Sequence, residues 1–168
     1  MKRVKILFHD IDGVLNCAST PYSPLGVRGI DDNKVAILKE IIDRTGAKIL
    51  LISSWKEGWY ARVDKKPFQD ETANYLDEAL ARHGLTITGK VKDLDYGGRG
   101  QSILEHLSLL RTKGIEIDRF VILDDHQDDY RKCGLGEHLV KTSFLKGGLT
   151  QKKAITAIEL LSDKQRPT

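Results

Sequence analysis

The sequence predicts an α/β fold in which helices cover both faces of a central parallel β-sheet. Short apolar runs recur along the chain, and segments with helical spacing, each about ten residues long, separate them. The clearest runs are continuously apolar, which is typical of strands buried on both faces of a parallel sheet. We therefore expect a Rossmann-like three-layer sandwich.

The first third of the chain predicts strand, loop, helix and strand in that order. Residues 4–8 form a β-prone run, and the stretch 16–29, which contains proline and glycine, is typical of a loop. The acidic pair at 31–32 supplies N-cap candidates for a helix that Gly46 ends. Residues 48–52 form the second apolar strand.

The middle of the chain predicts two further helices. The first begins at residue 70 or 72 and runs to 83, with Gly84 where a C-cap belongs, and residues 85–88 form a short strand after it. A second helix covers residues 102–113, because its apolar side chains share one face.

The last third predicts a clear strand at 120–123, a short strand at 139–141 and a helix at 149–161. The length of 168 residues suits one domain. We expect this domain to span residues 1–162 and residues 163–168 to form a disordered tail.

Composition excludes several classes of protein. The 27 basic and 24 acidic residues give a net charge of +3, which permits an anionic substrate without requiring one. Apolar runs of about five residues are far shorter than the roughly 20 needed to span a membrane. Cys17 and Cys133 are too few for a disulfide framework or a zinc site, and the N-terminal apolar run is too short for a signal peptide. We expect a cytoplasmic protein.

Acidic and hydroxyl side chains follow the predicted strands. Asp10 and Asp12 follow the first strand, Ser53 the second, and Asp124 and Asp125 the strand at 120–123. Ligands of parallel sheets bind outside the carboxyl ends of the strands, so these side chains should meet at one edge. Grouped carboxylates repel each other unless a cation intervenes, and oxygen ligands suit Mg²⁺. A magnesium and phosphate site is the prediction.

A phosphate site also needs a tight turn and a positive charge. Gly13 allows the backbone to turn after the acids, and Arg99 precedes the helix at 102–113. Lys56, Lys90 and Lys92 are rivals for the basic role. Each feature alone is more typical of a cap, a turn or a surface residue, and only their ordered occurrence favours a site.

Three motifs carry a resemblance to a known family. Residues 8–16 (FHDIDGVLN) resemble the first motif of the haloacid dehalogenase-like (HAD) phosphatases, residues 51–53 the second and residues 122–125 the fourth. The resemblance spans about residues 4–160. Trp55, the Gly-Arg pair before the 102–113 helix and the sequence Gly-Leu-Thr near the end resemble the small HAD domains of polynucleotide-repair proteins. The segments after the first two strands leave no room for a large cap domain.

The resemblance implies a mechanism. Asp10 would be the nucleophile that forms an aspartyl-phosphate, and Asp12 the general acid and base. Mg²⁺ would bind Asp10, the backbone carbonyl of Asp12, and Asp124 with Asp125 as second acid. Ser53 would orient the phosphoryl group, and Arg99 would take the basic role of the third motif. Ser54 remains a rival of Ser53, because a one-residue slip at a strand end exchanges its two faces.

An uncapped site admits a bulky substrate such as a nucleic-acid end. The segment after the second strand interleaves aromatic and basic residues, which suits a single strand. They are Trp55, Lys56, Trp59, Tyr60, Arg62, Lys65 and Lys66. The alternative is that Trp55 packs in the core and the lysines face solvent. Tyr22 is a further candidate beside the site.

Three functions follow, from different classes. The first is a phosphomonoesterase that acts on polynucleotide 3′-phosphate ends. The second is a phosphatase for nucleotides or metabolites, and the third is a non-catalytic module that binds nucleic acid or protein. The intact pair Asp10 and Asp12 argues against the third, because binding alone requires neither.

Overall fold

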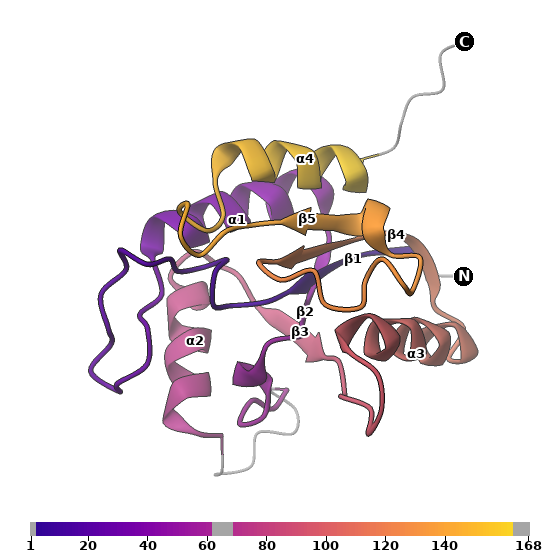
Figure 1. Ribbon diagram of the computed structural model, residues 1–168, viewed down its shortest axis with the longest axis horizontal. Coiled ribbons are helices and arrows are strands. Elements are labelled where there is room, and N and C mark those ends of the chain that lie inside the picture. The colour runs from indigo at the N-terminus through magenta and orange to yellow at the C-terminus, as the bar shows by residue number, and fades with distance from the viewer. Residues whose placement is uncertain (1–2, 62–68, 163–168) are drawn as a thin grey trace.

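The computed structural model describes residues 3–61 and 69–162, drawn in colour in Figure 1. Its sheet has five strands, in the spatial order β3-β2-β1-β4-β5. They are β1 (Arg3–His9), β2 (Lys48–Leu51), β3 (Ile87–Lys90), β4 (Glu116–Asp124) and β5 (Leu139–Lys141). Every neighbouring pair is parallel. This confirms the predicted parallel α/β fold, with β1 at the centre.

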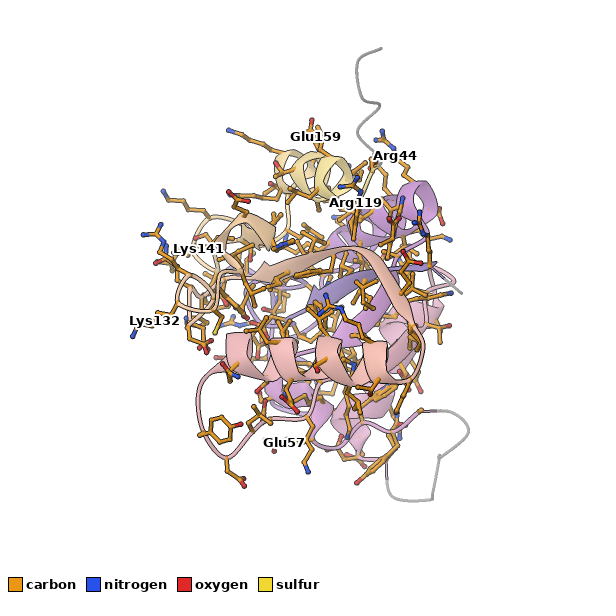
Figure 2. The ribbon with its side chains drawn as sticks, turned by 90° about the vertical axis from the view of Figure 1, so that its right-hand side faces the viewer. Arg44, Glu57, Arg119, Lys132, Lys141 and Glu159 are labelled. Atoms are coloured by element: carbon orange, nitrogen blue, oxygen red, sulfur yellow. The ribbon has the colours of Figure 1, made fainter. Side chains whose placement is uncertain are left out.

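Helices cover both faces of the sheet. They are α1 (Asp32–Thr45), α2 (Glu71–Ala81), α3 (Arg99–Thr112) and α4 (Gln151–Leu161). Figure 1 shows α1 and α4 on one face and α3 on the other, and Figure 2 shows the same three layers from the side. The sheet separates two hydrophobic cores, and successive residues of β1 point into different ones. Leu7 packs in the core that includes α1 and α4, and Phe8 packs in the core that includes α3.

Acidic side chains cap two helices, and the first of these caps was expected from the sequence. The carboxylate of Asp31 accepts a hydrogen bond from the backbone N–H of Asn33 (3.0 Å), and α1 ends at Gly46, whose φ is 69°. Asp70 caps α2 in the same way. The sequence predicted Gly84 as the C-cap of α2. The C-cap is Arg82, two residues earlier.

Other boundaries differ from the sequence prediction, and three of them lie at the starts of elements near the site. β3 begins two residues later than expected, α3 begins three residues earlier, and β4 begins at Glu116 rather than at residue 120. The start of β4 contains charged side chains that are only partly buried, so it lacks the apolar signal of a buried strand. The start of α3 has no side-chain cap of its own, because its N-cap is Gly98.

The chain has no inserted cap domain within residues 3–61 and 69–162. The connection from β1 to β2 contains a loop and α1, and the described part of the connection from β2 to β3 contains the 3₁₀ turn η1 (Ser54–Lys56) and α2. No helix in this part of the chain has the length and apolar character needed to cross a bilayer. The predicted tail, residues 163–168, lies outside the described residues, and the domain boundary at 162 stays a prediction.

Candidate active site

Two acidic residues meet where neighbouring strands end. Asp10 follows β1 directly, and Asp124 is the last residue of β4. The two strands are in register up to His9 opposite Leu123, and the backbone N–H of Asp10 donates to the carbonyl oxygen of Leu123 (2.9 Å). More than a hundred residues of sequence therefore separate two side chains that the sheet places next to each other.

Asp10, Asp124 and Asp125 form a carboxylate cluster. One oxygen atom from each residue lies within 4.8 Å of the other two. Asp10 and Asp124 are buried, at 3% and 0% exposed. The Oδ1 atom of Asp125 is also buried and accepts no hydrogen bond from any described residue. Nε2 of the exposed His126 lies 3.6 Å from this oxygen. Three grouped carboxylates with an oxygen that accepts no hydrogen bond fit a hard cation such as Mg²⁺.

Arg99 binds two members of this cluster. Its Nη1 donates to Oδ2 of Asp124 (2.7 Å) and lies 3.2 Å from Oδ2 of Asp10. The predicted rivals have other partners: Lys56 pairs with Asp93, and Lys90 donates to backbone carbonyl groups. Lys92 is exposed. Of these four candidate cations, Arg99 is the one in contact with the carboxylates.

Charge and burial set the pKa values in the cluster. Burial raises the pKa of Asp10 to about 7, and the neighbouring Asp124 adds to the rise while Arg99 opposes it. Burial also raises the pKa of Asp125. For Arg99, burial favours the neutral form, but the carboxylates of Asp10 and Asp124 outweigh it and hold the pKa above its usual range. Arg99 is one positive charge beside three carboxyl groups, and a bound cation would offset part of the remaining negative charge.

Asp12 is exposed and is held by two donors. Nδ2 of Asn16 donates to its Oδ1 (2.8 Å), and the indole Nε1 of Trp55 donates to its Oδ2 (3.0 Å). The Asn16 side chain also accepts from the backbone N–H of Gly13 (2.9 Å). The Asp12 carboxylate stands outside the carboxylate cluster, so its predicted metal contact rests on its backbone carbonyl alone.

Gly13 lies against Asp125. Its φ of 80° is in the left-handed region, and a Cβ at this position would overlap the carboxylate of Asp125. Any side chain here would therefore displace a member of the carboxylate cluster. Gly13 therefore gives Asp125 the space that a side chain would occupy, and only its backbone could contact a phosphate.

Ser53 and Ser54 differ in exposure. Ser53 is 1% exposed, and its Oγ accepts from the backbone N–H of Trp55 (3.3 Å), which caps η1. The backbone N–H of Ile52 donates to the carbonyl of His9 (3.1 Å), so Ser53 stays next to the end of β1. Ser54 is exposed. Only Ser53 is held in one orientation by a described contact.

Trp55 and Lys56 lie in the interior and not on an open binding surface. Trp55 is 8% exposed, and Lys56 is 5% exposed with its Nζ 2.6 Å from Asp93. Trp59 is buried as well, and its indole N–H donates to Asp77. These contacts support the alternative in which the tryptophans pack in the core, and they correct the expectation of a stacking platform here. Arg62, Lys65 and Lys66 lie outside the described residues.

Four positioning contacts were not expected from the sequence. The hydroxyl of Tyr130, fully buried, donates to Oδ2 of Asp124 (2.5 Å). Asp129 accepts from the backbone N–H groups of Gly98, Gly100 and Gln101, and so caps α3 from another part of the chain. Accordingly its pKa falls to about 2, because these donors outweigh the effect of burial.

The remaining two are Asn16 and Thr142, whose hydroxyl donates to the carbonyl of Gly13 (2.6 Å). Asp128 accepts from the backbone N–H of Asp129. The His126 side chain is mostly exposed, while its backbone N–H donates to Asp124.

Comparison with known protein families gives a match over most of the chain. The model for the HAD domain in Swiss Army Knife RNA repair proteins matches residues 6–154, which is most of the chain. No curated protein and no solved structure matches it. The matched region contains the ends of β1, β2 and β4 together with the start of α3. The chain therefore belongs to the family of HAD domains found in Swiss Army Knife RNA repair proteins.

Proposed function

We propose that the protein is a Mg²⁺-dependent phosphomonoesterase that works through an aspartyl-phosphate on Asp10 and acts on the 3′-phosphate ends of polynucleotides. One observation carries this proposal. The carboxylate of Asp10 belongs to a three-acid cluster that fits a hard cation, and it also pairs with Arg99. A buried carboxylate with positive charge beside it can approach a phosphate that would otherwise repel it.

In the first half-reaction, a carboxylate oxygen of Asp10 attacks the phosphorus atom. The bond from phosphorus to the ester oxygen breaks, and that oxygen takes a proton from the carboxyl group of Asp12. Asn16 and Trp55 hold both oxygens of Asp12 in place, which orients the acid toward the leaving group. The products are the free alcohol and an acyl phosphate on Asp10.

In the second half-reaction, water attacks the phosphorus of the aspartyl-phosphate. The carboxylate of Asp12 takes a proton from this water, the bond to Asp10 breaks, and inorganic phosphate leaves. Arg99 offsets negative charge on the transferring group in both steps, because its position is fixed by Asp10 and Asp124. Both aspartates return to their starting protonation states.

Asp10, Asp124 and Asp125 would hold the Mg²⁺ ion, which would shield the nucleophile from the charge of the phosphate. Tyr130, Arg99 and the backbone N–H of His126 orient Asp124 for this role. Each donor binds a named oxygen of Asp124, so the carboxylate cannot rotate freely. The buried Oδ1 of Asp125 accepts no hydrogen bond from the described residues and lies 3.6 Å from Nε2 of His126.

Two observations support a polynucleotide substrate. The site has no cap over it within the described residues, so it is open to a long ligand. The family to which the chain belongs is described by its occurrence in RNA repair proteins. A small-molecule phosphatase would not need an open site, and therefore serves as the alternative in the test.

The experiment measures phosphate release with Mg²⁺ from a 3′-phosphorylated oligonucleotide and from a nucleoside 3′-monophosphate. We expect faster turnover of the oligonucleotide. Asp10→Asn should reduce release by at least about a thousandfold. Asp95→Asn is the matched control, because Asp95 is exposed and outside the cluster. Asp12→Asn removes the proton donor of the first step and the base of the second, so phosphate release should fall by at least about a hundredfold.

Each other result assigns a different function. Release from the mononucleotide alone would identify a small-molecule phosphatase. Release from neither substrate by a folded, Mg²⁺-bound protein would contradict the proposal. Equal rates in wild type and Asp10→Asn would exclude Asp10 as the nucleophile.

A further inference from the structure

A basic cleft opens beside the carboxylate cluster. It has a volume of about 500 Å³ and lies between the end of β5 and the start of α4. We call it the lysine cleft and define it by Asp125, Lys141, Ser143, Lys146, Thr150 and Lys153. Because Asp125 belongs to both, the cleft is continuous with the carboxylate cluster.

The lysines of the cleft are available to a ligand. None of the ammonium groups of Lys141, Lys146 and Lys153 has a hydrogen-bond or ion-pair partner in residues 3–61 and 69–162. Asp125 is the one acid in its lining, and it lies at the end shared with the carboxylate cluster. The positive end of the α4 dipole adds to the attraction for anions. The cleft is therefore built for negative charge.

The cleft is attached firmly to the loop that carries Asp10 and Asp12. The hydroxyl of Thr142 donates to the carbonyl of Gly13 (2.6 Å), and the backbone N–H of Leu149 donates to the carbonyl of Val14 (2.9 Å). The backbone N–H of Thr142 also donates to the carbonyl of Asp124 (3.0 Å). An anion in the cleft would thus sit at a fixed place relative to the nucleophile.

Aromatic and apolar side chains lie on the rim. Phe144 lines the cleft, and the guanidinium carbon of Arg28 lies 5.3 Å from the centroid of its ring and 4.3 Å from the centroid of the Tyr22 ring. Tyr22 is 67% exposed and Leu145 83% exposed. Figure 1 shows the loop after β1 and the loop before α4 at the same end of the sheet. Lysines beside an exposed ring are what single-stranded nucleic acid binds.

We propose that the lysine cleft binds phosphodiester groups of the same single strand whose phosphorylated end lies at Asp10, and that Tyr22 stacks on one of its bases. The proposal rests on the proposed function for the chemistry at Asp10. It gives the enzyme a reason to prefer a strand to a mononucleotide, since only a strand reaches the carboxylate cluster and the cleft together. The segment of Trp55 and Lys56 takes no part in it.

The test is binding of a fluorescein-labelled RNA 12-mer with a 3′-phosphate, followed by anisotropy with Mg²⁺ over a range of salt. All proteins carry Asp10→Asn to prevent turnover. In Lys146→Gln/Lys153→Gln, the Kd should rise several-fold, and the slope of log Kd against log salt should fall by about 0.7 per lysine. Tyr22→Ala should raise the Kd with the slope unchanged. Lys48→Gln/Lys113→Gln, which removes equal charge from the other edge of the sheet, should bind like the parent.

A second readout separates this proposal from the function at Asp10. With active protein, the ratio of kcat/KM for the 12-mer to kcat/KM for a nucleoside 3′-monophosphate should fall in the cleft variant and stay constant in the control. Parental binding and an unchanged ratio in the cleft variant would overturn the cleft while leaving a phosphatase. Lysine-dependent binding without phosphate release from either substrate would overturn the phosphatase and support the cleft as a nucleic-acid site.

Discussion

The segment of Trp55, Lys56 and Trp59 and the lysine cleft combine the same kinds of side chain, but they use them in opposite ways. In the segment, the rings are buried and the Lys56 ammonium pairs with Asp93. The ammonium of Lys90, which lies 4.7 Å from the ring of Tyr60, donates to the carbonyl groups of Lys56 and Trp59. In the cleft, the ammonium groups have no partner among the described residues and an aromatic ring is exposed.

The difference teaches that residue type alone does not identify a binding surface. A lysine whose donors are satisfied by carbonyl groups stabilises the fold, whereas a lysine facing only water can exchange that water for a phosphate. The two roles predict different responses to substitution. Removing a lysine ammonium from the segment should lower the stability of the fold, and removing one from the cleft should lower ligand affinity.

The largest expected effect is on stability, from Lys90→Met. The change keeps the aliphatic stem but leaves the carbonyl groups of Lys56 and Trp59 without their donor. Two hydrogen bonds to a charged group, at roughly 1.5–3 kcal/mol each, suggest a loss of about 4 kcal/mol. Urea denaturation measures it, and Lys92→Met, at an exposed position two residues away, should cost no more than about 0.5 kcal/mol. Similar losses for both variants would remove the contrast between the regions.

The pH dependence of stability provides the second test. Asp10 is a buried carboxyl group in a site that we assign to a ligand, so its ionisation should cost stability when no ligand is bound. Its folded pKa of about 7 lies above the ordinary value of 3.8, so the unfolded chain ionises first as pH rises. The metal-free protein should therefore lose stability as pH rises through this window, by about 2–3 kcal/mol between pH 5 and pH 8. Added Mg²⁺ should reverse most of the loss.

The contribution of Asp10 is the difference between the free energies of unfolding of wild type and Asp10→Asn, measured by denaturation in EDTA across this pH range. The subtraction is needed because burial lowers the pKa of His9 to about 4, which makes stability rise with pH over part of the same range. Parallel pH profiles for the two proteins would show that Asp10 ionises normally in the folded state.

Trp55→Phe tests the side-chain contact by which the buried segment reaches Asp12. Phenylalanine keeps a ring in the core but removes the donor to Asp12. With Asp12 less well oriented, kcat should fall about tenfold with little change in KM. Trp59→Phe removes an indole donor to Asp77 and should leave kcat as it was. A change in KM alone would assign Trp55 to substrate binding.

The smallest effect is expected for stability in the cleft variant, Lys146→Gln/Lys153→Gln. These side chains have no described partner to lose, so the free energy of unfolding should change by less than about 0.5 kcal/mol. Thermal denaturation next to Lys90→Met compares the two regions directly. A large loss in the cleft variant would mean that its lysines hold the fold together.

Much of the fold follows from the sequence, because buried strands and helix caps leave local signals. Asp31 caps α1 where its position predicted a cap, and α2 begins next to Asp70, one of its two predicted starts. The grouping of Asp10 and Asp124 also follows, since parallel strands end at one edge of the sheet. β4 was only half predicted, because its first residues mix charged and apolar side chains.

The rest depends on partners distant in sequence. Nothing near Trp55 indicates that its indole reaches Asp12, and nothing near Asp129 indicates that it caps α3. Tyr130 has no local signal for its bond to Asp124. The sequence therefore placed the acids at the edge and could not distinguish buried lysines from available ones.

The spatial order of the strands has a consequence during synthesis. A nascent chain that has released β1, β2 and β3 can pair them, but one side of β1 stays open until β4 emerges. Asp124, Asp125 and the cap that Asp129 provides for the start of α3 arrive on that late segment. Domains fold largely as units as the ribosome delivers them. A ribosome-bound fragment ending near residue 115 would therefore carry Asp10 and Arg99 without the acids that organise them, and the carboxylate cluster cannot form until β4 has been translated.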